Sequence, residues 1–245
     1  MAIKVAFAVS LICCSTIVSA KDESNHSENN PVPVDIKLTP SYYQASDGNN
    51  AWDMNIRGSR GPQAGWIGFY RDHNGFQQTR TGYELTRDFE LAHIVSSVQA
   101  ASGGFLGGSI NAQLGNPVYA IVGFGRTNLR NYYNLNFDPN DAITVGVGTK
   151  AIPDTEISLF YIWDDRLDTR QRVTHLYLHR TVSKKERFSI DGSYKSGLTS
   201  DNNFVTGYAL TVTYAYRHYF VRIAHDQYVN FSNTTQNRLS LGMTF

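Results

Sequence analysis

The last nine residues, Asn237–Phe245, constrain the fold of this chain more than any other stretch. Apolar residues alternate there with small or polar ones: Leu239, Leu241, Met243 and Phe245 against Arg238, Ser240, Gly242 and Thr244. Successive side chains of a β-strand point to opposite faces of its sheet. This alternation therefore predicts a strand with one apolar face and one small or polar face, ending on an aromatic residue.

This ending resembles the C-terminal strand of bacterial outer-membrane β-barrels, which closes the barrel and ends in Phe. The resemblance extends to a secretory segment at residues 1–20 and to the alternating pattern in between, and it is to the class rather than to a specific family. It implies a transmembrane antiparallel β-barrel in the outer membrane of a Gram-negative bacterium. The partners that it implies are outer-membrane lipid, lipopolysaccharide and the barrel-insertion machinery.

Residues 1–20 have the pattern of a signal peptide. Lys4 supplies the positive charge, Val5–Val18 is largely apolar, and small residues precede cleavage after Ala20. The apolar run is too short for a spanning helix, and a retained anchor is the alternative. Residues 21–33 are polar and end in prolines, which predicts a flexible periplasmic lead before a barrel at residues 34–245. A eukaryotic secreted protein is the alternative location, because Asn25 begins a glycosylation triplet.

Composition argues against several classes of function. Cys13 and Cys14 are the two cysteines of the chain, and both lie in the predicted signal peptide, so the mature chain has no disulfide and no thiolate metal site. The chain has 22 Lys and Arg and 21 Asp and Glu residues, and the signal peptide contains Lys4 and no acid, so the mature charges balance. This balance gives no reason to expect a nucleic-acid partner, and we expect no cofactor and no metal.

Units of about ten alternating residues, separated by turn sequences, fill residues 34–245. They predict fourteen strands: Val34–Gln44, Ala51–Arg60, Ala64–Asp72, Phe76–Thr86, Phe89–Ala101, Phe105–Leu114, Val118–Arg126, Ala142–Lys150, Thr155–Asp164, Arg170–Thr181, Arg187–Ser196, Phe204–Tyr214, Tyr219–Tyr228 and Asn237–Phe245. Twelve is the alternative if two weak segments, such as the first and its neighbour, are loops. A soluble sandwich fits less well, because its strands average about five or six residues.

Short and long connections alternate along the predicted barrel. Two-to-five-residue turns predict the periplasmic end, and longer polar segments predict extracellular loops. The longest loop, Thr127–Asp141, is predicted outside, with both termini in the periplasm. One hypothesis has Tyr132 and Tyr133 of this loop folding inward to constrict a pore.

With the apolar face toward lipid, the other face must line the interior of the barrel. Charges of both signs lie on it, and we select six pore-lining candidates: Arg80, Glu84, Lys150, Asp191, Lys195 and Arg222. A closed barrel must hydrate or pair such charges. This face therefore predicts either a channel or a salt-bridged wall held by pairs such as Arg80 with Glu84.

The lipid-facing surface has its own candidates. Arg166, Arg170 and Arg172 in and after one charged outer segment are candidates for contact with phosphate headgroups, and a plain solvated loop is the alternative. Aromatic residues near strand ends predict interfacial girdles: Tyr42, Tyr43, Trp52, Trp66, Tyr70, Trp163, Tyr214 and Tyr219.

Histidines are the remaining candidates for chemistry. His175 and His179 share a strand face, but four strand residues separate them by roughly 13 Å, too far for one metal ion. The sequence contains no Gly-x-Ser-x-Gly elbow and no His-Glu-x-x-His motif, so we select no catalytic residue.

Three functions follow from this pattern. The first is a porin-like passive channel for small polar solutes. The second is an outer-membrane hydrolase acting on lipid or peptide, with a triad assembled across strands. The third is a non-conducting surface or adhesion barrel.

Overall fold

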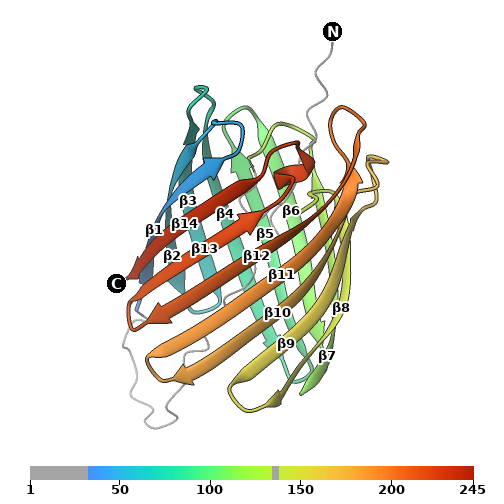
Figure 1. Cartoon of the computed structure of the whole chain (residues 1–245). Helices are drawn as coiled ribbons and strands as arrows, with labels where there is room; N and C mark the ends of the chain where they lie inside the picture. The colour runs from blue at the N-terminus through green and yellow to red at the C-terminus, as the bar shows by residue number, and fades with distance from the viewer. Residues whose placement is uncertain (1–32, 134–137) are drawn as a thin grey trace.

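The computed structural model describes residues 33–133 and 138–245. Fourteen antiparallel strands form one closed barrel, in which each strand pairs with its neighbours in sequence and β14 pairs with β1 (Figure 1). The strands are β1 (Asp35–Ala45), β2 (Ala51–Arg60), β3 (Gln63–Asp72), β4 (Gln77–Phe89), β5 (Ala92–Ala101), β6 (Phe105–Leu114), β7 (Val118–Thr127), β8 (Ala142–Ile152), β9 (Thr155–Asp164), β10 (Arg172–Ser183), β11 (Glu186–Leu198), β12 (Phe204–Tyr216), β13 (Tyr219–Asp226) and β14 (Gln236–Thr244). One 3-10 turn, η1 (Val229–Phe231), precedes β14.

The structure confirms the predicted fold class and strand number. Residues 35–45 form β1, which closes the barrel against β14, so the twelve-strand alternative is wrong. The expected strands Phe76–Thr86 and Phe89–Ala101 leave Arg87 and Asp88 for a turn, and this placement is wrong: β4 continues to Phe89 and the chain reverses at residues 90–91. The ladder continues because Asp88 lies opposite His93, and their side chains form a hydrogen-bonded pair. The predicted signal peptide and residues 21–32 of the predicted lead lie outside the described residues.

The barrel is apolar outside and polar inside. In β14, Leu239 and Leu241 are 47% and 54% exposed on the outer face, whereas Arg238 and Ser240 on the inner face are 8% and 2% exposed. Lipid-facing and interior-facing side chains thus alternate residue by residue along β14, which is the pattern of a transmembrane barrel. No helix in the described ranges is long and apolar enough to cross a membrane.

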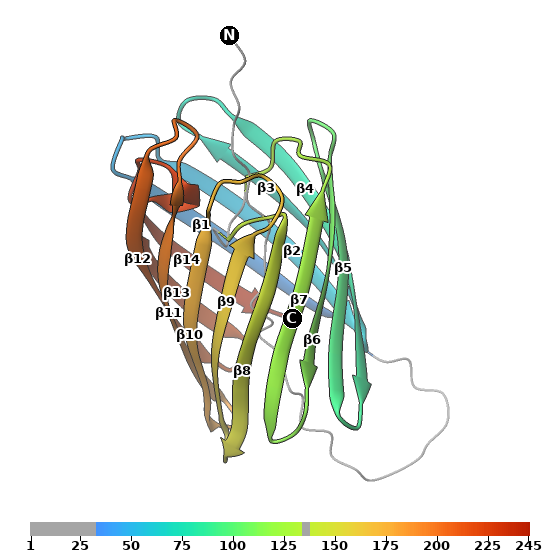
Figure 2. The same ribbon diagram turned by 90° about the vertical axis from the view of Figure 1, so that its right-hand side faces the viewer.

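The connections differ at the two ends of the barrel. The longer segments, including residues 128–141 between β7 and β8, share one end, which we call the loop end (Figures 1 and 2). Turns of two or three residues, such as those at 153–154 and 184–185, lie at the opposite end, which we call the turn end. The predicted alternation of short and long connections is therefore confirmed except between β5 and β6, where the loop-end connection at 102–104 has three residues.

Most buried apolar clusters inside the barrel lie toward the loop end. One joins Tyr43, Tyr70 and Val229 with the partly buried Tyr133, and a second joins Phe105 with Tyr132. A third packs Val173 and Val205 against Phe231 of η1. The loop end of the lumen is therefore filled by side chains, and this packing positions the candidate site.

Candidate functional site

The segment after β7 turns into the lumen rather than away from the barrel. Tyr132 stacks on Phe105 of β6 with ring centroids 4.3 Å apart, and its hydroxyl donates to Oε1 of Gln99 on β5 at 3.1 Å. Burial raises the pKa of the Tyr132 phenol to about 12, so the hydroxyl keeps its donor proton at neutral pH. Tyr133 stacks on Tyr70 of β3 at 3.7 Å. The inward fold of Tyr132 and Tyr133 is thus observed.

Polar contacts then carry this segment across the barrel. The Gln78 side chain of β4 holds the backbone, donating to the Asn131 carbonyl and accepting from the Tyr133 N–H, each at 2.8 Å. On the far wall, Nε2 of Gln236 on β14 donates to the Tyr133 hydroxyl at 3.2 Å. Strands β7 and β14 lie half-way round a fourteen-strand barrel from each other. The described residues up to Tyr133 therefore follow the inner wall from β6 to β3, and the Tyr133 hydroxyl reaches β14. We call the described residues 128–133 and 138–141 the crossing segment.

The return of this segment is fixed on a third part of the wall. Asp138 accepts from Nε2 of His175 on β10 at 3.0 Å, and Nδ1 of the same ring contacts Asp191 of β11 at 2.9 Å. Phe160 of β9 stacks on the imidazole with ring centroids 4.7 Å apart. His175 therefore links the crossing segment to β9, β10 and β11.

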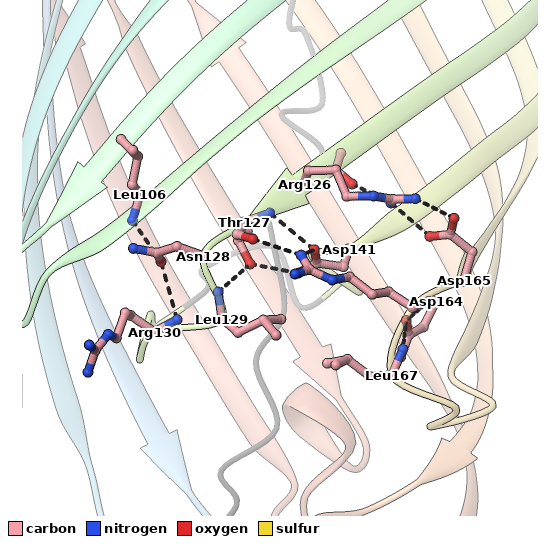
Figure 3. Close-up of polar contacts among 12 residues, drawn as sticks. Leu106, Arg126, Thr127, Asn128, Leu129, Arg130, Asp141, Asp164, Asp165 and Leu167 are labelled. Carbon is pink, nitrogen blue, oxygen red and sulfur yellow. Dashed lines mark hydrogen bonds and ion pairs between the residues drawn. The ribbon is translucent and has the colours of Figure 1, made fainter.

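Both ends of the segment are tied together at the loop end (Figure 3). Asp141 accepts from the Thr127 N–H at 3.1 Å and from the Thr127 hydroxyl at 2.6 Å. Arg166 donates to the Asp141 carboxylate at 2.7 Å and to the Thr127 carbonyl at 2.8 Å. Beside it, Arg126 forms an ion pair with Asp165. These bonds close the base of the crossing segment.

The three headgroup candidates therefore have different surroundings. Arg166 is engaged by Asp141, which leaves its side chain 40% exposed. Arg170 is exposed in the β9–β10 loop, and Arg172 is exposed at the start of β10 on the outer face. Contact of these residues with lipid headgroups stays a prediction.

Buried ion pairs surround the crossing segment. Arg80 of β4 pairs with Asp53 of β2, and Lys195 of β11 pairs with Asp226 of β13, with every one of these side chains at most 3% exposed. Glu84 pairs with Arg57 of β2. The pairing expected between Arg80 and Glu84 is thus wrong, because each finds its partner two strands away rather than four residues along its own strand. Both partners of a buried pair need each other, since removing one leaves an uncompensated charge.

The six pore-lining candidates all point inward, but they fall into two groups. Arg80, Glu84 and Lys195 are buried in the ion pairs just described. Three others retain exposure: Lys150, Asp191 and Arg222. The Lys150 ammonium group donates to Gln113 at 3.2 Å and lies 3.8 Å from Glu156. Whether the six residues line a path for solutes stays a prediction.

The turn half of the lumen carries basic residues that the sequence reasoning missed. Lys37, Arg57 and Arg187 are half-buried there on inward-facing positions of β1, β2 and β11. The alternation along each strand shows which residues face inward, so the inward orientation of these three residues could have been predicted from the sequence. Which of them lie near one another could not be predicted, because that depends on strand register.

Three of the eight predicted girdle aromatics point inward instead. Tyr43 and Tyr70 are 0% and 2% exposed, because they pack against Tyr133 in the lumen. Trp66 covers Gly82 on the neighbouring strand, where an added Cβ would meet the indole at 2.6 Å. The others lie on the outer face, as girdle residues would: Tyr42, Trp52, Trp163, Tyr214 and Tyr219.

Among the described residues, neither His175 nor His93 is placed to serve a hydrolytic triad. Both ring nitrogens of His175 face carboxylates, which leaves no nitrogen to activate a nucleophile. His93 faces Asp88, but the nearby Ser97 hydroxyl is bonded to Ser109. Within residues 33–133 and 138–245, no three His, Cys, Asp or Glu side chains are grouped as metal ligands.

Comparisons with known proteins agree with the architecture. No protein-family model matches the sequence, and no curated protein is significantly similar to it. Among solved structures, outer membrane protein Omp33 of Acinetobacter baumannii matches with a TM-score of 0.58 at 12% identity, covering 88% of this chain and 100% of Omp33. The fold is that of an outer-membrane β-barrel. Its apolar exterior suits the bacterial outer membrane, where barrels of this kind reside.

Two further matches are more distant. A KdgM porin, solved in complex with disordered oligogalacturonate, has a TM-score of 0.47 at 10% identity, covering 85% of this chain and 99% of that one. A variant of the Rh. blastica porin has a TM-score of 0.49 at 8% identity, covering 87% of this chain and 100% of that one.

Proposed function

We propose that this protein is a porin-like outer-membrane channel through which small polar solutes diffuse. The observation that carries the proposal is the inside-out barrel, whose inner wall holds charges of both signs while its outer wall is apolar. A hydrated polar path of this kind replaces the hydrocarbon barrier, and its fixed charges bias which ions enter.

The crossing segment sets the size class of the solute. Tyr132 is anchored on β5 and β6, Tyr133 on β3 and β14, and Asp138 on β10, while Gln78 of β4 holds the backbone at Asn131 and Tyr133. A solute passing the loop end must therefore pass beside this segment. The proposed substrates are for this reason small.

A non-conducting barrel is the second candidate, and one specific observation favours it. The pairs Asp53–Arg80 and Lys195–Asp226 are almost completely buried, so much of the interior charge serves the wall rather than water. A surface role for the loops would then replace transport.

Single-channel conductance of the purified, refolded protein in a planar bilayer decides between the two candidates. Folding is verified first by the heat-modifiable gel mobility of the barrel. Steady current steps from the folded protein would support the channel. A folded protein that leaves the bilayer sealed would refute the channel and leave the non-conducting barrel.

A further inference from the structure

An apolar groove lies on the lipid-facing wall of the barrel, where β8, β9 and β10 run side by side (Figure 2). It has a volume of about 440 Å³ and is lined by Val145, Gly146, Val147, Leu159, Phe160, Tyr161 and Thr174. The side chains of Val145, Val147 and Leu159 are 43%, 58% and 51% exposed, which places the groove outside the lumen. Because this wall faces hydrocarbon, the groups that can fill the groove are the acyl chains of lipids.

An aromatic pair and one arginine stand beside the groove, toward the loop end. The rings of Tyr161 and Trp163 stack with their centroids 5.5 Å apart. Arg172 lies directly opposite Trp163 in the β9–β10 ladder, and Thr174 of the groove lies opposite Tyr161. Two residues along a strand span roughly 7 Å, so Arg172 projects from the wall about that much closer to the loop end than Thr174.

Arg172 has no acidic neighbour on this wall. The outward-facing positions of β8, β9 and β10 contain no Asp and no Glu. None of the ion pairs among the described residues includes Arg172. An arginine on a lipid-facing wall extends its guanidinium toward the headgroup layer, where its planar fork matches the oxygens of a phosphate.

The acids of the adjacent β9–β10 loop are directed elsewhere or matched within the loop. Asp165 pairs with Arg126. Asp164 stands at an inward position of β9 and accepts hydrogen bonds from two backbone N–H groups of its own loop. Asp168 and Arg170 are exposed in this loop and carry opposite charges. The arginine at the start of β10 is therefore the charge that the lipid face presents beside the groove.

We propose that the groove and Arg172 form a binding site for lipopolysaccharide. An acyl chain of its lipid A lies in the groove, and a lipid A phosphate accepts hydrogen bonds from the Arg172 guanidinium. The longer connections of a bacterial barrel face the outside, and the groove lies near the loop-end termini of its three strands, so its neighbour is the outer leaflet. Tyr161 and Trp163 stand at the depth of the headgroups, as aromatic belts do. This site does not depend on whether the barrel conducts.

Native mass spectrometry of the folded protein measures the binding, because each bound lipopolysaccharide molecule adds a discrete mass. The refolded barrel in detergent is titrated with purified deep-rough lipopolysaccharide. Arg172→Gln removes the phosphate contact, and Val147→Phe fills the groove. We expect each change to weaken binding about tenfold, since a hydrogen bond to a charged group and the burial of a few methylene groups each contribute that much.

Two control variants carry the same substitutions at other places on the outer wall. Arg180→Gln changes an arginine on the same face of the same strand, in the turn half of the barrel. Val98→Phe enlarges a valine of β5 that is 57% exposed. Both should bind lipopolysaccharide as the wild type does. Heat-modifiable gel mobility verifies the folding of every variant, and Thr174→Leu replaces Val147→Phe if the latter does not fold.

Two further ligands identify the lipid. Lipopolysaccharide freed of its phosphates should bind the wild type as weakly as the intact form binds Arg172→Gln, and phosphatidylglycerol should bind more weakly than lipopolysaccharide. Equal binding by the wild type, Arg172→Gln and the groove variant would overturn the site. A loss in Arg180→Gln as large as that in Arg172→Gln would overturn it too, because the charge would then act without regard to place. Phosphatidylglycerol that binds as tightly as lipopolysaccharide would overturn the assignment of the lipid.

Discussion

Replacing Tyr133 by alanine tests whether the crossing segment constricts the lumen. The change removes a ring stacked on Tyr70 at 3.7 Å and a hydroxyl that accepts from Gln236 at 3.2 Å. Stacking contributes about 0.5–1.5 kcal/mol, a hydrogen bond about as much, and burial of part of the ring a further 1–1.5 kcal/mol. Docking of the segment should therefore weaken by about 2–4 kcal/mol, which is roughly thirtyfold or more in its docking equilibrium.

The effect should fall on the segment rather than on the barrel. The wall is held by strand ladders all the way round, so heat-modifiable mobility should persist in Tyr133→Ala. Single-channel recordings should show larger current steps and more open-channel noise, because the crossing segment loses the contacts of the Tyr133 side chain with Tyr70 and Gln236. Tyr133→Phe keeps the stack and should change the steps little.

A tyrosine on the outer face of the barrel supplies the control. Tyr42 is 52% exposed on the outer face, so Tyr42→Ala removes a ring of the same size without touching the lumen. Conductance and noise of Tyr133→Ala equal to those of Tyr42→Ala would show that the segment does not limit the current. The constriction would then have to be abandoned.

Three further changes test other parts of the interior. Lys195→Met should leave the buried Asp226 carboxylate without its ion-pair partner and destabilise the barrel by about 3–5 kcal/mol, which lowers the temperature at which gel mobility shifts. Adding Asp226→Leu should restore most of the lost stability. Asp141→Asn should loosen the base of the crossing segment, and limited proteolysis of the folded protein should then cut faster at the loop end than in the wild type. Gly242→Ala should displace the Phe220 ring, because an added Cβ would come within 1.7 Å of a ring carbon, and should lower the temperature at which gel mobility shifts; an unchanged temperature would refute the close packing of the ring on Gly242.

The barrel could be predicted from sequence because its signal is local. Alternation has a period of two, so ten residues suffice to show a strand and its two faces. The turn at residues 90–91 was misplaced because polar Arg87 and Asp88 look like a turn, whereas in the structure they lie in the ladder opposite β5. Local polarity does not show where a hairpin reverses.

The girdle prediction failed for a related reason. An aromatic residue near a strand end can face lipid or the lumen, and composition does not distinguish the two. Strand geometry does: Tyr42 and Tyr43 are consecutive, so only one of them can face the lipid. The structure places Tyr42 outside and Tyr43 under Tyr133.

Register was the information that the sequence lacked. The partners of Arg80 and Glu84 lie on β2, and Lys37 of β1 lies opposite Arg57 of β2 and over the Phe220 ring of β13. No spacing along one strand reveals such groupings, because they depend on how far each strand slides against the next. The alternation therefore predicted an inward charged face but not which charges meet.

The two halves of the lumen are built from different chemistry, and this separates size from charge. Toward the loop end, packed tyrosines and buried ion pairs fill the lumen, so the size of a solute limits its passage there. Toward the turn end, the inward-facing side chains of Lys37, Arg57 and Arg187 keep part of their surface exposed, so a solute meets fixed charge there. Independent sites give additive effects. Combining Tyr133→Ala with Lys37→Gln should therefore raise the current as the first change does and shift the reversal potential in a salt gradient as the second does, and a reversal potential that shifts with Tyr133→Ala alone would show that one filter serves both purposes.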